Sequence, residues 1–221
     1  MSNLWLGTTW AELMEWLPML LQAFVINLQV TALTLLIGLP GGFLLALGLQ
    51  SRRRTVSVPT LALVELGRGA PALVLVQFVY FGLPQVSLTI GSFSAAVVAL
   101  ALSCACYTSE IIRSGLDAVA RGQKEAAHAL NLSAIDELRF IVLPQALRIS
   151  TPALLGFAIL VLQSTTLCFT IALPEVVAQA YEIGSISFRY FPVLLLTALM
   201  FVVVCVPASV AVGWLESKTK S

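Results

Sequence analysis

Charge is the property that this sequence has least of. Only 10% of its 221 residues are Asp, Glu, Lys or Arg, whereas 59% are hydrophobic, and the mean hydropathy is +0.97. Soluble domains carry about 25% charged residues, so a water-soluble chain of this composition would expose large apolar patches. The composition therefore favours a membrane protein. The net charge of +1 gives no indication of a nucleic-acid partner.

Side chains that usually carry catalysis or bind metals are also scarce. His128 is the only histidine, and the four cysteines, Cys104, Cys106, Cys168 and Cys205, lie in apolar runs without a CxxC pair. Cysteines in such surroundings usually behave as small buried hydrophobes. We therefore predict no catalytic residue, no metal site and no cofactor in this chain. The sequence also lacks a GxxxxGK[ST] phosphate-binding loop, so an ATP-driven step would need a second protein.

Long apolar runs, by contrast, are abundant. A helix needs about 20 mostly apolar residues to span a membrane. Five segments reach about this length: 20–49, 58–82, 93–112, 146–172 and 192–214. The first contains Pro40, where we expect a kink or an early end. The sequence thus predicts an all-α membrane protein with five transmembrane helices in a single domain, residues 1–221.

Basic residues fall in alternate connections between these segments. Arg52, Arg53 and Arg54 lie in the first connection and most of the others lie in the third, whereas the second has none and the fourth only Arg189. Cytoplasmic loops carry an excess of Lys and Arg. We therefore expect the N-terminus outside and the C-terminus in the cytoplasm.

The third connection, about residues 121–144, is a polar insert in an otherwise oily chain. Its pattern predicts two short helices, one over about 123–130 and one after Ser133, which can act as an N-cap with Asp136 three residues on. Asn131 falls at the corner between the two helices. Asn tolerates the left-handed conformation better than most residues, so a sharp turn is expected there.

Each predicted helix of the insert carries apolar residues at helical spacing. The first stripe is Ala126, Ala127 and Leu130, and the second is Ile135, Leu138 and Val142. On pattern alone, the insert is typical of an amphipathic elbow that rests on its own bundle or on the membrane. Pro144 disfavours a helical conformation at Leu143, so we expect a break before the fourth span.

The insert also carries a family resemblance. The stretch "EAAHALNLSAIDELRFIVLP" resembles the EAA signature of ABC-importer permeases; Glu125, Ala126, Ala127, Ile141, Leu143 and Pro144 fall on the signature, and Asn131 replaces its usual glycine. Two further stretches, "ELGRGAPALVLVQFVYFGLP" and "YTSEIIRSGLDAVARGQKEAA", resemble the polar amino acid branch of that family. The similarity covers most of the chain from about residue 25 onward.

The resemblance implies a type I ABC-importer permease fold and a transmembrane subunit of an ATP-driven importer for a polar amino acid or a related small polar solute. It makes the insert a pair of coupling helices, with Glu125, Ala126, Ala127, Asn131, Ile141, Leu143 and Pro144 as the ATPase-coupling residues. The implied partners are an ATP-binding subunit dimer that holds ATP and Mg²⁺, a second permease subunit (a copy or a homologue), an extracytoplasmic solute-binding protein and membrane lipid. The implied location is the bacterial cytoplasmic (inner) membrane.

Polar side chains within the spans are candidates for the substrate pathway. Glu65 and Arg68 lie three residues apart in the second span and share a helix face, which suits either an internal ion pair or a pathway lining. The fourth span contains Gln163, Ser164, Thr165 and Thr166. These side chains suit hydrogen bonding within or between helices or a substrate lining. The family usually has "KDTSL" here, so the loss of both charges would suit a subunit whose partner supplies most ligand contacts.

Two further expectations complete the prediction. Glu175, Glu182 and Arg189, in the fourth connection, are expected to be exposed, either as contacts for a solute-binding protein or as part of a solvated loop. The alternative function is an ion-driven secondary carrier or a channel. Carriers often use broken helices and ionisable groups at mid-membrane, but five spans without an internal repeat fit that class poorly.

Overall fold

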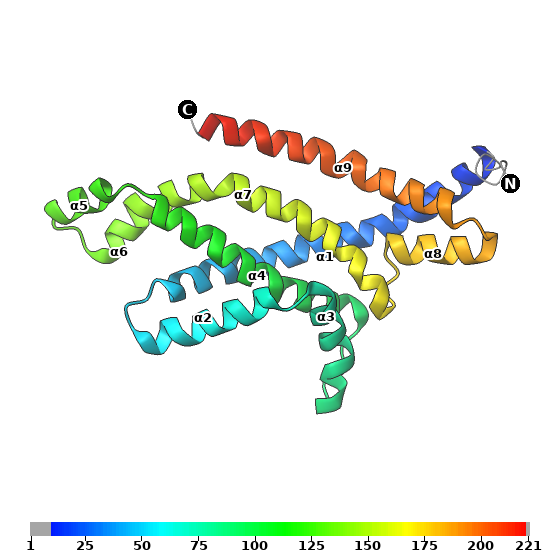
Figure 1. Cartoon of the computed structure of the whole chain (residues 1–221), viewed down its shortest axis with the longest axis horizontal. Coiled ribbons are helices and arrows are strands. Elements are labelled where there is room, and N and C mark those ends of the chain that lie inside the picture. Colours follow the sequence, from blue (N-terminus) through cyan, green and yellow to red (C-terminus); the bar gives the residue numbers. More distant parts are fainter. Residues whose placement is uncertain (1–9, 220–221) are drawn as a thin grey trace.

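The computed structural model describes residues 10–219, and the elements in this range are helical (Figure 1). The α-helices are α1 (Trp10–Leu49), α2 (Arg54–Gly69), α3 (Ala72–Gln77), α4 (Ser92–Ala118), α5 (Arg121–Ala129), α6 (Ala134–Asp136), α7 (Leu143–Ser164), α8 (Val176–Ser187) and α9 (Tyr190–Thr219). Two π-helical segments, η1 (Phe78–Gly82) and η3 (Glu137–Val142), and two 3₁₀ segments, η2 (Leu83–Val86) and η4 (Thr165–Ile171), join or extend them.

Four continuous helical stretches in the described range are long and apolar enough to cross a membrane. They are Ala11–Leu49, Ser92–Ala118, Ala134–Ile171 and Tyr190–Lys218. A fifth crossing exists if Arg54–Gly69 and Ala72–Val86, which are bent by 102° relative to each other, count as one span. The chain therefore has four to five apolar spans, in agreement with the sequence-based expectation.

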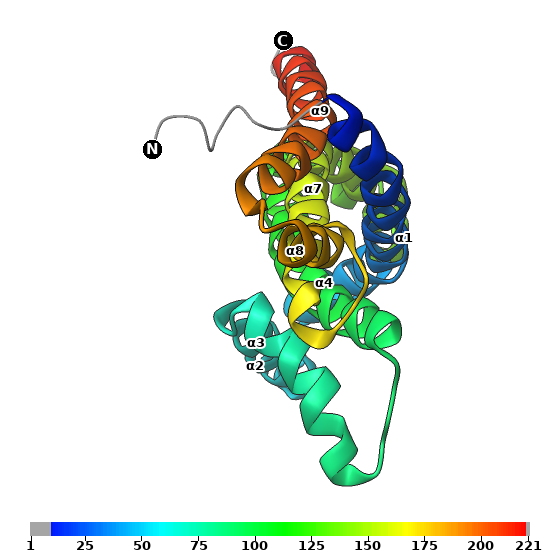
Figure 2. The ribbon, with the colours of Figure 1, turned by 90° about the vertical axis from the view of Figure 1, so that its right-hand side faces the viewer.

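The second predicted span, 58–82, is a bent pair and not one helix. The bend lies at Ala70, which has an extended conformation with φ −79° and ψ 128°. The next residue is Pro71, and a residue that precedes proline is disfavoured in the helical conformation. Figure 2 shows the result: the segment that follows α3 projects away from the rest of the molecule.

Contrary to the expectation from the sequence, Pro40 and Pro144 do not end the helical stretches that contain them. The first span begins at Trp10 and continues through Pro40 to Leu49, so the early end does not occur. The break predicted at Leu143 is also wrong, because one helical stretch runs from Ala134 to Ile171. Pro144 lies in the first turn of α7, directly after η3. A proline has no N–H to donate, and the wider hydrogen-bond spacing of the π-helical segment accommodates that loss.

Small residues allow α1 and α4 to pack closely along their length. Gly38 and Gly42 are four residues apart on α1, in the pattern that lets membrane helices approach each other. A Cβ atom on Gly38 would lie 2.6 Å from Cys104 Sγ and 2.7 Å from Cys104 Cβ. The contact with α4 therefore leaves no room for a side chain on Gly38.

The two ends of the molecule carry different elements. Figure 1 shows α5, α6 and the connection between α1 and α2 at one end, and α8 with the start of α1 at the other. The polar insert and the three consecutive arginines Arg52, Arg53 and Arg54 thus lie at the same end. This arrangement is the one expected if that end faces the cytoplasm.

Candidate coupling surface and polar cavities

The polar insert folds as a helical hairpin whose corner is Asn131. Its φ of 54° is left-handed, as expected from the sequence. The Leu132 N–H donates to the Ala127 carbonyl at 3.1 Å, and the Asn131 N–H donates to the His128 carbonyl at 2.9 Å. These bonds end α5 in the manner of a Schellman motif, where glycine is common and Asn is the usual substitute.

The second half of the hairpin begins at the predicted cap. Ser133 Oγ accepts a hydrogen bond from the Asp136 N–H at 3.2 Å and donates to Asp136 Oδ2 at 2.6 Å. This contact satisfies an N–H group that the first turn of a helix would otherwise leave unpaired. Neighbouring residues therefore specify both the end of α5, at Asn131, and the start of α6, at Ser133.

The apolar residues of the hairpin face two directions. Ala127 is 1% exposed and Val142 is 4% exposed, so both pack inward. Leu130 of the first stripe and Ile135 of the second are 73% and 76% exposed, and we call these two residues the apolar tip. Of the other predicted coupling residues, Glu125, Ala126, Asn131 and Pro144 are exposed, and Ile141 and Leu143 are half-buried.

A chain of alternating charges lies between α2 and α4. Arg68 Nη1 is 3.7 Å from Glu65 Oε1 and 3.9 Å from Glu110 Oε2. Glu110 accepts two hydrogen bonds from Arg113, from Nη2 at 2.7 Å and from Nε at 3.2 Å. Arg113 Nη1 is in turn 3.3 Å from Asp117 Oδ2. The pair that the sequence indicated, Glu65 and Arg68, is thus one end of a longer network.

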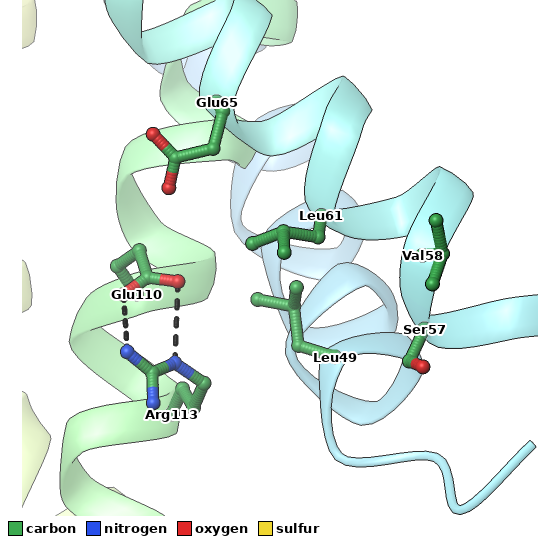
Figure 3. A pocket seen from close by; sticks show the side chains of 7 residues that line it. All are labelled: Leu49, Ser57, Val58, Leu61, Glu65, Glu110 and Arg113. Carbon is green, nitrogen blue, oxygen red and sulfur yellow. Dashed lines mark hydrogen bonds and ion pairs between the residues drawn. The ribbon is translucent and has the colours of Figure 1, made fainter. Parts of the chain in front are cut away.

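This network borders an open cavity of about 400 Å³. Its lining is Leu49, Ser57, Val58, Leu61, Glu65, Glu110 and Arg113. Figure 3 shows Glu65 on α2 and the Glu110–Arg113 pair on α4 facing this space. We did not include Glu110 among the predicted site residues. Its spacing to Arg113 and Asp117, three and seven residues on, places all three on one helix face and could have indicated the network.

A second cavity, of about 470 Å³, lies between α3, α4 and the end of α7. Its lining is Ala72, Ser103, Tyr107, Phe157, Leu160, Gln163, Ser164, Thr166 and Leu167. The hydroxyls of Ser164 and Thr166 donate to carbonyls of their own helical segment at 2.8 and 2.7 Å, so their oxygens retain lone pairs that can accept a hydrogen bond. We call this space the polar cavity.

An aromatic pair forms one wall of the polar cavity. The rings of Tyr107 and Phe157 are stacked with centroids 5.5 Å apart. The Tyr107 hydroxyl donates to the Arg68 carbonyl at 3.0 Å, which joins this wall to α2. A third cavity, of about 330 Å³, follows toward the hairpin end, and Glu110, Ser114 and Ser150 contribute to its lining.

These cavities follow one face of α4. Ser103, Tyr107, Glu110 and Ser114 are spaced by four, three and four residues, which is the repeat of one helix face. Polar groups in the spans are costly unless they face a protein interior or a water-filled cavity. The cavities therefore lie in a row along α4 between Ser103 and Ser114, and both polar and apolar side chains line them.

Thr165 lies apart from the polar cavity. It is fully buried and accepts a hydrogen bond from Asn27 Nδ2 on α1 at 2.8 Å. Asn27 Nδ2 also donates to Glu175 Oε2 at 2.9 Å, and Asn27 Oδ1 accepts from the Val176 N–H at 3.1 Å. We call these three buried residues, Asn27, Thr165 and Glu175, the outer junction.

The expectation that Glu175 is exposed is wrong. Glu175 is 0% exposed, and its carboxylate caps α8, accepting from the Val177 N–H at 3.1 Å and the Ala178 N–H at 2.9 Å. Burial raises the pKa of the Glu175 carboxyl above its ordinary value of 4.5, and the hydrogen bonds from Asn27 and from the two backbone groups partly oppose this rise. Glu182, by contrast, is exposed as expected.

Comparisons with known proteins place this geometry in a family. Residues 38–221 match the model of the family described as "Binding-protein-dependent transport system inner membrane component". The chain is 34% identical to the arginine transport system permease protein ArtQ of Bacillus subtilis, over 93% of this chain and 94% of that protein. It is 35% identical to the probable glutamine ABC transporter permease protein GlnP of the same organism, over 91% and 94%.

A solved structure supports the same assignment. The fold superposes with a TM-score of 0.90 on a chain from the crystal structure of an amino acid ABC transporter with histidines. The two chains are 29% identical, and the match covers 96% of this chain and 100% of that one.

Proposed function

This chain belongs to the family of binding-protein-dependent transport system inner membrane components, and we propose that it forms the translocation pathway of an ATP-driven importer for a polar amino acid or a related small polar solute. The observation that carries this function is the row of cavities along α4 of a multi-pass membrane protein, each with polar side chains in its wall. Amino acid permeases are also the relatives that this chain resembles over nine-tenths of its length.

The energy for transport comes from a partner ATPase that binds ATP and Mg²⁺. The apolar tip of the hairpin, Leu130 and Ile135, is the contact for that ATPase. Exposed apolar residues at the end of a polar hairpin are typical of a surface that a partner covers. The signature residues Glu125, Ala126, Ala127, Asn131 and Ile141 lie between the start of α5 and the end of η3, and Leu143 and Pro144 begin α7, which continues from η3.

Transport then follows from a shift between two arrangements of the spans. Nucleotide binding in the ATPase favours one arrangement, and the hairpin transmits that preference to α4 and α7. The hairpin end faces the cytoplasm, as the arginines beside it indicate. The C-terminus lies on that side and the start of α1 outside, where a solute-binding protein delivers the solute. The location is the bacterial inner membrane, and a second permease subunit completes the pathway.

The solute passes through the polar cavity and then along the charged network. Gln163, Ser164 and Thr166 supply neutral hydrogen-bonding groups in the outer half. Glu65 lines the cavity of about 400 Å³, and Arg68 Nη1 lies 3.7 Å from Glu65 Oε1. The bent α2–α3 pair is a feature shared with the ion-driven carriers considered above. Family membership and the exposed apolar tip favour the ATP-driven importer.

Reconstitution tests this function. We expect an ATP-binding subunit to copurify with the chain, and uptake of radiolabelled L-glutamine or L-arginine into proteoliposomes to require that subunit and ATP. Leu130→Asp should weaken the association, because it places a charge in the apolar contact, whereas Leu130→Met should preserve it. Uptake by the purified chain alone, driven by a proton or sodium gradient, would refute the proposal.

A further inference from the structure

The outer junction connects three segments that are far apart in the sequence. Asn27 lies on α1, Thr165 begins η4, and Glu175 caps α8, so the hydrogen bonds of Asn27 bridge 138 and 148 residues. All three residues are fully buried. Buried polar groups that satisfy one another in this way fix the relative position of the elements that carry them.

One residue of the junction, Thr165, is adjacent in the chain to residues that line the polar cavity. Thr165 lies between Ser164 and Thr166 in the chain, and both of these line the cavity together with Gln163. Because η4 continues directly from α7, a displacement of Thr165 moves the backbone that presents those three side chains. The junction thus holds the outer wall of the polar cavity in place.

The other side of the junction is α8, at the end of the molecule opposite the hairpin (Figure 1). The Glu175 carboxylate accepts both of its backbone hydrogen bonds from the first turn of α8. A second contact joins the same elements, because Phe169 of η4 and Tyr181 of α8 are stacked with centroids 5.6 Å apart. α8 also packs an apolar face, Val176, Ala180 and Ile183, against α1.

We propose that the outer junction couples α8 to the polar cavity, so that docking of a solute-binding protein at the outer end repositions Gln163, Ser164 and Thr166. This inference rests on the function proposed above. Asn27, Thr165 and Glu175 are positioning residues in this scheme, since they act through η4 and do not contact the solute. Asn27 is the centre, because it bonds both the cavity segment and the α8 cap.

A matched pair of substitutions at Thr165 tests the coupling. Thr165→Val keeps the size and the burial but removes the oxygen that accepts from Asn27, whereas Thr165→Ser keeps that oxygen. The readout is the ratio of ATPase activity with the solute-loaded binding protein to basal activity, measured on the complete transporter in nanodiscs. We expect Thr165→Val to lower this ratio by about fivefold, the lower end of allosteric coupling effects. Thr165→Ser should retain the ratio of the unsubstituted transporter.

The other outcomes are equally decisive. Glu175→Gln, which removes one acceptor oxygen from the junction, provides a second variant and should lower the ratio as well. An unchanged ratio in Thr165→Val and Glu175→Gln, even with reduced thermal stability or basal activity, would overturn the proposal, because it would leave the junction a purely structural role. If the unsubstituted transporter has ATPase activity that no binding protein stimulates, the coupling is refuted and the importer assignment fails with it. If it is stimulated and the variants are too, only the coupling fails.

Discussion

Replacing Gly38 with alanine tests the contact between α1 and α4. The new Cβ would lie 2.7 Å from Cys104 Cβ, an atom fixed by the α4 backbone, so rotation of the Cys104 side chain cannot relieve the clash. Overpacking of this kind costs about 1–3 kcal/mol. An alanine also stabilises a helix by about 0.5–1 kcal/mol relative to glycine. This gain partly offsets the cost of the clash, so a control variant must account for it.

Gly213→Ala supplies the matched control. Gly213 lies inside α9, and its Cβ would meet nothing within 4 Å, so this variant has the helix-propensity gain without the clash. The difference between the two variants isolates the overpacking. For a chain of this size, about 1 kcal/mol shifts Tm by about 2–4 °C. We therefore expect Gly38→Ala to melt about 2–12 °C below Gly213→Ala.

The assay is the loss of monodisperse protein on heating in detergent, followed by size-exclusion chromatography. A Cys104→Gly background removes the clashing atoms and should narrow the difference, as a double-mutant cycle would show. If Gly38→Ala melts at or above the temperature of Gly213→Ala, the close packing of α1 on α4 is refuted.

Three further predictions concern the hairpin and the buried carboxylate. Asn131→Val should destabilise the hairpin by about 1–2 kcal/mol, because a β-branched residue resists the left-handed conformation; limited proteolysis should cleave that hairpin faster, with Asn131→Gly as resistant as the natural sequence. Ala127→Trp should keep the chain in the membrane but uncouple ATP hydrolysis from uptake, because Ala127 is 1% exposed and a large ring would displace the hairpin; normal coupled uptake would contradict this. Glu175 has a raised pKa in the folded state, so the folded protein binds its proton more tightly than the unfolded chain and is stabilised at low pH. This stabilisation should decline as the pH rises from about 4.5 through the raised pKa, and Glu175→Gln should lack it; an unchanged difference in Tm between the two proteins across this range would refute the reasoning.

Local features of the structure follow from local sequence. The apolar segments mark the spans because a membrane requires about 20 apolar residues for each crossing. The turn at Asn131 and the cap at Ser133 follow from the preferences of single residues with neighbours three to five positions away. The bend at Ala70 has an equally local cause in Pro71, although we did not predict it. The prediction of a break at Leu143 was wrong, because a π-helical segment directly before α7 accommodates Pro144 without ending the helix.

The sequence by itself therefore determined the membrane class, the positions of the apolar segments and the turn and cap at the corner of the hairpin, since each depends on composition or on neighbouring residues. Only the tertiary structure decided which polar residues meet. Asn27 and Glu175 are 148 residues apart, and the sequence around Glu175 does not show whether its carboxyl is buried or solvated until the helices pack. Arg68 and Glu110 likewise form their pair because α2 lies beside α4. Whether a polar side chain is buried, capped or exposed to a cavity depends on groups that distant parts of the chain supply.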